Sequence, residues 1–290
     1  LTKMLSRLSP LRAFRWTITR KLSNSPQRTF VWEAGGRKVF RVHFPSIDST
    51  NKYALAHHRE LGGEEVTLVS ADGQTAGRGR FARSWSSGKG GNVAATFCTT
   101  IRHPHFYLLS PILAVSAVRA LRSLGFTAAG LKWPNDIMIG RRKVGGVLCE
   151  GAPLGQGKGA FVALGVGINV NMTAAVLESI SRPVWPPTSL LVAGGGEEMD
   201  VEQVYHALMV EVPKAISVFE ERGFAAFQDD YCSFSVMLGE RVTFDCGDEG
   251  KPELVTGKAV AVEADGRLTI ELDGGRRRSF MCGEIKSLVP

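Results

Sequence analysis

Acidic residues are absent from the first 32 positions of this 290-residue chain, which hold seven lysines and arginines. The other 28 basic residues equal the 28 acidic residues in number, so the formal charge of +7 comes entirely from the start of the chain. A nucleic-acid-binding domain is usually basic in its folded part, so this distribution argues against a nucleic-acid partner. An acid-free, basic segment that contains serine is typical of an organellar transit peptide. We therefore predict a mitochondrial targeting leader at residues 1–32, with a disordered tail as the alternative interpretation and a plastid or cytoplasmic location as the alternative destination.

Long apolar runs and paired metal ligands are also missing. No apolar run approaches the roughly 20 residues that span a bilayer, and the mean hydropathy is +0.00. The five cysteines form no C-x-x-C pair, and the six histidines lack partners at metal-ligand spacing. With 44% hydrophobic residues the chain can bury a substantial core. These features predict a globular protein without a membrane partner, a disulfide framework or a protein-bound metal.

Alternating and periodic segments predict an α+β fold, with helices packed on a mixed or antiparallel sheet. Strands are expected at residues 37–44, 65–71, 92–101, 130–133, 136–139, 143–150 and 160–169. Helices are expected at residues 49–61, 110–125, 200–222 and 224–232. Ser49 is expected to cap the first helix, since serine is a preferred residue at that position.

A second domain is predicted from about residue 236, where short alternating runs replace the longer elements. Asp265-Gly266 and Asp273-Gly274-Gly275 separate some of these runs and indicate hairpin turns. We predict a domain at residues 36–235 and a small β-barrel at residues 236–290. The alternative is that these strands extend the main sheet.

Acids are missing a second time between Asp72 and Asp136, where eight basic residues occur. Five glycines interleave with four of these cations in the loop at residues 77–91. Glycine lets backbone N–H groups approach an anion closely, and arginine offers a rigid fork of donors for phosphate. The loop is therefore predicted to bind a multiply charged anion. A solvated basic loop is the alternative, but it would be expected to have acids nearby in the sequence.

Two common phosphate-binding motifs do not fit this loop. Gly88-Lys89 is followed by Gly90, where a P-loop requires serine or threonine. Gly77-x-Gly79 lacks the acidic residue that a dinucleotide-binding motif carries about 20 residues later. The anion site must therefore belong to another class.

The motifs themselves resemble those of biotin protein ligases. The matching segments are STN at 49–51, GRGR at 77–80 with Arg83 and Trp85, KWPND at 132–136, RKVGGVLCE at 142–150, GVGIN at 165–169 and GEI at 283–285. They occur in the family's order and cover the chain after the leader. Ala82 departs from the pattern, because the family often has glycine there. About 35 residues precede the first expected strand, too few for the winged-helix domain of members that act as repressors, so no DNA-binding role is expected.

The resemblance implies a fold, an activity and partners. The fold would be a class II synthetase-like biotin/lipoate ligase catalytic domain followed by an SH3-like β-barrel. The activity would use biotin and ATP, with Mg²⁺, to form biotinyl-5′-AMP, and would then transfer biotin to a lysine of a biotin carboxyl carrier domain. A monomer or a homodimer is expected.

The same resemblance assigns the site residues. Biotin contacts are expected from Ser49, Thr50, Gln74, Gly77, Arg78, Lys143 and Gly146. ATP and adenylate contacts are expected from Arg80, Arg83, Trp85, Lys132 and Asn169. The catalytic residues would be Lys143, Arg80, Lys132 and Asp136. Lys143 would hold the biotin carboxylate against the α-phosphate, while Asp136 would either orient Lys132 or help to deprotonate the acceptor lysine.

Two alternatives stay open at this point. A lipoate-type protein ligase shares the adenylation chemistry, but its loop is RR-x-SGGG-like, and this chain has GRGR and KWPND instead. A non-catalytic biotin or nucleotide-binding regulator would be expected to have lost the site lysines or loop arginines. All of these cations are present.

Overall fold

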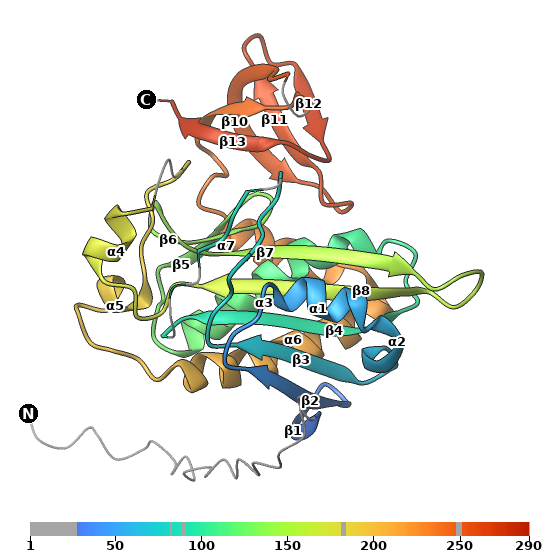
Figure 1. Cartoon of the computed structure of the whole chain (residues 1–290). Coiled ribbons are helices and arrows are strands. Elements are labelled where there is room, and N and C mark those ends of the chain that lie inside the picture. Colours follow the sequence, from blue (N-terminus) through green and yellow to red (C-terminus); the bar gives the residue numbers. More distant parts are fainter. Residues whose placement is uncertain are drawn as a thin grey trace, which may run out of the picture.

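The computed structural model has two sheets, each formed by a separate part of the chain (Figure 1). The structure describes residues 28–81, 83–86, 88, 91–180, 184–247 and 251–289. Residues 1–27 of the predicted leader, together with Lys89 and Gly90 of the basic loop, lie outside the described residues.

The larger sheet has eight strands in the order β1-β2-β3-β4-β8-β7-β6-β5. Their bounds are β1 Thr29–Ala34, β2 Arg37–Phe44, β3 Val66–Ala71, β4 Val93–Ile101, β5 Ala129–Lys132, β6 Asp136–Ile139, β7 Arg142–Pro153 and β8 Ala160–Ile168. Strands β2 and β3 pair in parallel, and the other neighbours are antiparallel. The seven predicted strands are all found. Strand β1 was not predicted, and it overlaps the last four residues of the range assigned to the leader.

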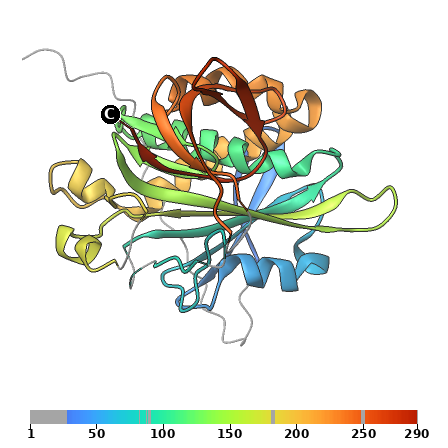
Figure 2. The same ribbon diagram turned by 90° about the horizontal axis from the view of Figure 1, so that it is seen from above.

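Helices cover both faces of this sheet (Figure 2). On one face lie α3 (Leu109–Ser123), α6 (Val201–Arg222) and α7 (Gln228–Phe234), which enclose the main core. On the other face α1 (Thr50–Ala56) and α2 (His58–Leu61) enclose a smaller cluster that includes Val69, Cys98 and Phe161. Because both faces are covered, β4 and β8 are buried along almost their whole length.

The remaining helical segments are short. They are η1 (Phe106–Leu108), α4 (Ala174–Glu178), α5 (Leu190–Ala193) and η2 (Phe224–Phe227). The stretch Phe106–Ser123 is apolar and long enough to cross a membrane, the one such stretch in the described part of the chain, and 61% of it is buried inside the protein. Its longer part, α3, contributes buried side chains to the main core.

The predicted helix at residues 49–61 is divided in two. Its start is as expected, since Ser49 Oγ accepts a hydrogen bond from the Lys52 N–H. At His57 the backbone leaves helical geometry, with φ −107° and ψ 23°, and α2 begins at the next residue. The N-cap places Ser49, Thr50 and Asn51 at the end of α1 that faces the loop at residues 72–86.

The C-terminal strands form their own five-stranded antiparallel sheet in the order β12-β11-β10-β9-β13, which fits an SH3-like fold and does not extend the main sheet. Their bounds are β9 Arg241–Asp245, β10 Leu254–Val262, β11 Leu268–Leu272, β12 Arg277–Phe280 and β13 Glu284–Leu288. Strand β12 ends at Phe280, and the chain turns through Gly283 (φ 132°) into β13, which pairs with β9. The predicted α+β class with a small β domain is confirmed.

Two tryptophans connect the sheets. Trp133 Nε1 donates to Gly266 O at 3.1 Å, and Trp185 Nε1 donates to Ile285 O at 3.1 Å. Both indoles are almost fully buried. These bonds fix the terminal sheet above the end of the main sheet where the basic loop lies (Figure 1).

Candidate active site

A cavity of about 400 Å³ lies between the start of α1, the basic loop, β7, β8, the segment around Trp185 and the terminal sheet. Most of the predicted site residues line it, namely Ser49, Thr50, Gln74, Arg78, Arg80, Arg83, Trp85, Asp136, Lys143, Gly146 and Asn169. Gly77 and Lys132 do not line the cavity wall. One pocket thus gathers residues that are more than 100 positions apart in the chain.

The end of the pocket near α1 is polar, and its charged residue, Arg78, is paired with Glu150. Gln74 Oε1 accepts hydrogen bonds from the Thr50 N–H at 2.9 Å and from Thr50 Oγ1 at 3.2 Å. Thr96 Oγ1 lies 2.6 Å from Asn51 Oδ1. Ser49, Thr50 and Asn51 are all buried. This end therefore offers fixed donors and acceptors without net charge, which suits a neutral polar group.

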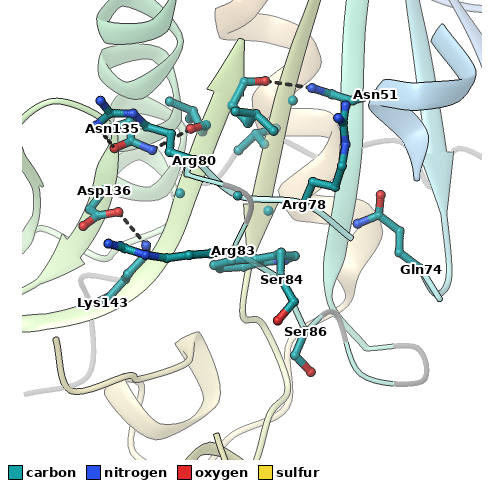
Figure 3. A pocket seen from close by; sticks show the side chains of 18 of the residues that line it. Asn51, Gln74, Arg78, Arg80, Arg83, Ser84, Ser86, Asn135, Asp136 and Lys143 are labelled. Carbon is teal, nitrogen blue, oxygen red and sulfur yellow. Dashed lines mark hydrogen bonds and ion pairs between the residues drawn. The ribbon is translucent and has the colours of Figure 1, made fainter. Parts of the chain in front are cut away.

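The opposite end is cationic and is organised around Asp136 (Figure 3). Lys132 Nζ lies 2.7 Å from Asp136 Oδ2, and Lys143 Nζ lies 2.5 Å from Asp136 Oδ1. Burial acts to raise the pKa of Asp136, but the two ammonium groups outweigh it and the pKa is lowered. Burial lowers the pKa of Lys132, against the opposing effect of Asp136. The carboxylate thus holds both lysines in place, with Lys143 at the cavity and Lys132 behind it.

The basic loop folds as a tight hairpin. Gly79 N donates to Arg83 O at 2.7 Å, Trp85 N donates to Gly77 O at 2.8 Å, and Arg78 and Ser84 form an antiparallel bridge. This geometry brings the three arginines to the pocket mouth. It also occupies the carbonyl of Gly77, a residue expected to contact biotin, with a hydrogen bond from the Trp85 N–H.

Distant carboxylates compensate two of the three loop arginines. Arg78 Nη2 lies 2.6 Å from Glu150 Oε2, and Arg83 makes a two-pronged ion pair with Glu284 of β13. Burial opposes ionisation of Glu284, but hydrogen bonds from Arg83 and Lys286 outweigh it and lower its pKa to about 2. The acids that are missing from the local sequence are therefore supplied by other strands.

Arg80 has a different environment. Its Nη1 donates two long hydrogen bonds of 3.4 Å, to Asn135 Oδ1 and to Gly283 O. Burial lowers the pKa of Arg80, against the opposing effects of Asp136 and Glu284. A half-buried guanidinium with long hydrogen bonds to uncharged partners gains most from an incoming anion.

Trp85 lies flat against β8 at Gly167. A Cβ atom built on Gly167 would come within 2.6 Å of the Trp85 indole, so a glycine is needed for this approach. Lys143 Nζ lies 5.7 Å from the centroid of the same ring. The indole therefore forms an apolar wall beside the cationic end of the pocket.

Asn169 lines the pocket at the end of β8. Its Nδ2 donates to Thr188 O at 2.9 Å, and its backbone N–H donates to Val144 O at 2.8 Å. The side chain therefore anchors the segment that carries Trp185 as well as facing the cavity.

Sequence reasoning missed several residues that line the pocket. Asn51, Asn135 and Glu284 fall inside the recognised motifs, which was the available signal for them. Phe81 and Trp185 carry no comparable signal in the sequence. No group of three or more histidine, cysteine, aspartate or glutamate side chains that could hold a metal occurs in the part of the chain that the structure describes.

Comparison with known families agrees with both halves of the structure. Residues 43–169 match the Biotin/lipoate A/B protein ligase family, and residues 237–286 match the Biotin protein ligase C terminal domain. The first match contains every predicted site residue, and the second contains Glu284. Each matched region thus contributes side chains to the same pocket.

Individual relatives carry related names. The chain is 30% identical over 243 residues to the bifunctional ligase/repressor BirA of Escherichia coli, covering 83% of this chain and 72% of that protein. It is 29% identical to the biotin--[acetyl-CoA-carboxylase] ligase of Paracoccus denitrificans, covering 79% of this chain and 93% of that protein. It is 25% identical to the chloroplastic biotin--protein ligase 1 of Arabidopsis thaliana, covering 66% of this chain and 51% of that protein.

A solved structure agrees with these relatives. The biotin protein ligase of Aquifex aeolicus, in complex with biotin and ATP, superposes with a TM-score of 0.65 at 28% identity, covering 86% of this chain and 98% of that one. The shared two-sheet architecture, the matched regions and the motifs gathered around one pocket lead to the same conclusion: the chain belongs to the biotin protein ligase family.

Proposed function

We propose that this chain is an ATP-dependent biotin protein ligase, which joins biotin to ATP and then transfers the biotin to a lysine of an acceptor protein. The observation that carries the proposal is the contrast between the two ends of one pocket. The uncharged end at Thr50 and Gln74 suits the neutral ureido ring of biotin. The cationic end at Lys143, Arg80 and Arg83 suits a triphosphate.

In the first step, an oxygen of the biotin carboxylate attacks the α-phosphorus of ATP. A carboxyl–phosphate bond forms, the bond between the α- and β-phosphates breaks, and pyrophosphate leaves with the electron pair. Both reactants are anionic, so fixed cations lower the barrier by offsetting their repulsion. We assign this role to Lys143, which Asp136 holds at 2.5 Å, and to Arg80 and Arg83 at the pocket mouth.

In the second step, the acceptor lysine amine attacks the acyl carbon of biotinyl-5′-AMP. The new amide C–N bond forms, the bond to AMP breaks, and the amine loses its proton. Alignment of bound reactants can supply roughly 7–11 kcal/mol of such a barrier, so no covalent enzyme intermediate is required. The lowered pKa of Asp136 makes it a weak base, which favours a positioning role over proton abstraction.

Lys132 is assigned a supporting role. It is 1% exposed, lies behind Asp136 and does not line the cavity. Its ammonium group would help to hold Asp136 in place, and its positive charge would attract the phosphates from a greater distance than that of Lys143.

Mg²⁺ is proposed to enter with ATP. Mg²⁺ usually retains water and binds substrate phosphates together with one or two carboxylates. Asp136 and Glu284 are the carboxylates that line the pocket, and both are engaged by cationic side chains. The described residues therefore suit a metal held mainly by the phosphates, where it would neutralise charge on the leaving group.

The acceptor is proposed to be a biotin carboxyl carrier domain of a biotin-dependent carboxylase, in line with relatives named for acetyl-CoA carboxylase. The match of residues 237–286 to a biotin-specific C-terminal domain favours biotin over lipoate. Assembly as a monomer or a homodimer is part of the same proposal.

We further propose that residues 1–32 direct the protein to mitochondria, on the basis of their seven positive charges and no negative ones. A plastid destination is the alternative, since one plant relative is named as chloroplastic. Residues 29–32 of this range belong to β1. A cleaved leader would therefore end before Thr29.

Avidin blotting tests the function directly. The protein is incubated with biotin, ATP, Mg²⁺ and a biotin carrier domain. A parallel reaction contains lipoate and a lipoyl domain instead, and the mass of that domain reports any attachment. We expect ATP-dependent labelling of the carrier lysine with biotin and none of a lipoyl domain with lipoate. A carrier domain without its lysine is the control, and absence of lysine-linked biotin would refute the proposal.

A further inference from the structure

Phe81 lies at the tip of the basic loop in an unusual conformation. With a φ of 55°, it is the single residue other than glycine with positive φ among those that the structure describes. A bulky side chain is strained in this region, which normally favours glycine or asparagine. Strain of this kind is retained where function requires it. Phe81 is also 43% exposed, so burial of its ring in the core does not explain the residue.

The hairpin places the Phe81 ring beside two arginines. Arg83 N donates to Arg80 O at 3.2 Å, which closes the turn around Phe81. The Arg80 guanidinium carbon lies 4.8 Å from the ring centroid, and that of Arg83 lies 5.6 Å from it. Both distances are within the range of cation–π attraction. All three side chains line the pocket.

The ring and a phosphate can engage the same arginine together. A guanidinium stacks on an aromatic ring through its flat face, while its N–H groups point outward in its own plane. A phosphate takes these N–H groups and leaves the stacked face undisturbed. Glu284, in contrast, occupies the N–H edge of Arg83 and must compete with an incoming anion.

We propose that Phe81 is a positioning residue for ATP. Its ring holds the guanidinium groups of Arg80 and Arg83 at the pocket mouth. Arg80 then presents N–H groups to the triphosphate, and at Arg83 the triphosphate competes with Glu284 for the N–H edge. Side chains that are already ordered lose less freedom when ligand binds, which improves affinity. The inference rests on the proposed function, because it assumes that these arginines bind ATP phosphates.

Two substitutions at Phe81 distinguish the effect of its aromatic ring from the effect of its positive-φ backbone conformation. Asparagine tolerates positive φ and lacks the ring, so Phe81→Asn keeps the turn and removes the platform. Phe81→Tyr keeps the ring in the same backbone strain and is the matched control. We expect Phe81→Asn to raise the KM for ATP about fivefold, equivalent to about 1 kcal/mol, and to leave the KM for biotin unchanged. Phe81→Tyr should retain the wild-type KM for both substrates.

Pyrophosphate release measures both KM values, and isothermal titration with ATP alone measures binding without turnover. A wild-type KM for ATP in Phe81→Asn, an equal rise in KM for biotin, or an equal defect in Phe81→Tyr would each overturn the proposal. Failure of the wild-type protein to release pyrophosphate would contradict the proposed function instead. In that event the titration still decides the role of Phe81, since ATP affinity should fall in Phe81→Asn and not in Phe81→Tyr.

Discussion

The Lys143 ammonium lies 2.5 Å from Asp136 Oδ1 and faces the cavity, with its position fixed by that carboxylate. If it joins the biotin carboxylate to the α-phosphate, Lys143→Ala should abolish adenylate formation in a folded protein. Loss of one such charge-stabilising group costs roughly 10²–10³-fold in rate. Lys143→Arg should also be poor, because a planar guanidinium does not replace a compact ammonium. Pyrophosphate release measures the effect, circular dichroism verifies folding, and a wild-type rate for Lys143→Ala would refute the assignment.

Arg80 is expected to retain the reactive intermediate. A hydrogen bond to a charged group contributes roughly 1.5–3 kcal/mol, and loss of about 2 kcal/mol would speed escape of biotinyl-5′-AMP about thirtyfold. Arg80→Gly should therefore still form the adenylate but release it, so that bystander proteins become biotinylated. The mutant and wild type are each mixed with ATP, biotin and serum albumin. Equal labelling of albumin by both, with adenylate formation verified, would exclude Arg80 as the retention residue.

Gly167 is expected to be intolerant of even one methyl group. Gly167→Ala would place a Cβ 2.6 Å from the Trp85 indole and displace it. Overpacking of this kind costs about 1–3 kcal/mol, so the KM for ATP should rise roughly tenfold. Gly73→Ala is the matched control, because its nearest neighbour, Gly88 O, lies 3.5 Å away. Similar KM values for the two variants would show that the Trp85 contact does not matter for ATP.

Glu284 gives the fold a predictable response to acid. Its pKa in the folded protein is lowered to about 2, below its ordinary value of 4.5. The stabilisation is therefore complete above about pH 4.5 and is lost as the pH falls towards 2. Glu284→Gln should lower the free energy of unfolding at pH 7 and should flatten its pH dependence between 4.5 and 2. Urea unfolding measures both effects. Glu253→Gln, at the exposed ion pair with Arg278, should change neither noticeably.

The leader is tested separately from the enzyme. Residues 1–28 fused to a fluorescent protein should enter mitochondria, because the segment is basic and free of acids. The fusion ends before β1, so that no strand of the fold is carried along. A variant with its arginines and lysines replaced by glutamine is the control. Diffuse cytosolic fluorescence of the unaltered fusion would contradict mitochondrial targeting, and plastid fluorescence in plant cells would favour the alternative.

Local patterns were sufficient for most of the fold. Alternation located the strands of the main sheet, and Ser49 marked the start of α1. Strand β1 was missed because its first residues continue a basic, acid-free segment. The helix break at His57 was missed because no glycine or proline marks it.

Site residues that lie inside sequence motifs could be predicted. Contacts that the fold makes between residues far apart in the sequence could not. Asp136 and Lys143 come from adjacent strands, β6 and β7 respectively, and their motifs predicted both. The partner of Arg83 is Glu284, 201 positions away, so the acid-free sequence around the loop gave no indication of it. The shortage of acids near the loop in the sequence predicts that the charge of its arginines is uncompensated. The structure shows that strands β7 and β13 supply the compensating acids instead.

Because Glu284 and Gly283 form part of the pocket mouth, the pocket can be completed only late in the synthesis of the described residues. Ribosomes add roughly 5–20 residues per second, so the 201 positions between Arg83 and Glu284 separate the two residues by about 10–40 s. During that interval the nascent chain contains the basic loop but not its two later partners. These are the Gly283 carbonyl, which accepts a hydrogen bond from Arg80, and the Glu284 carboxylate, which pairs with Arg83. A growing chain therefore cannot complete this pocket mouth before β13 has been made.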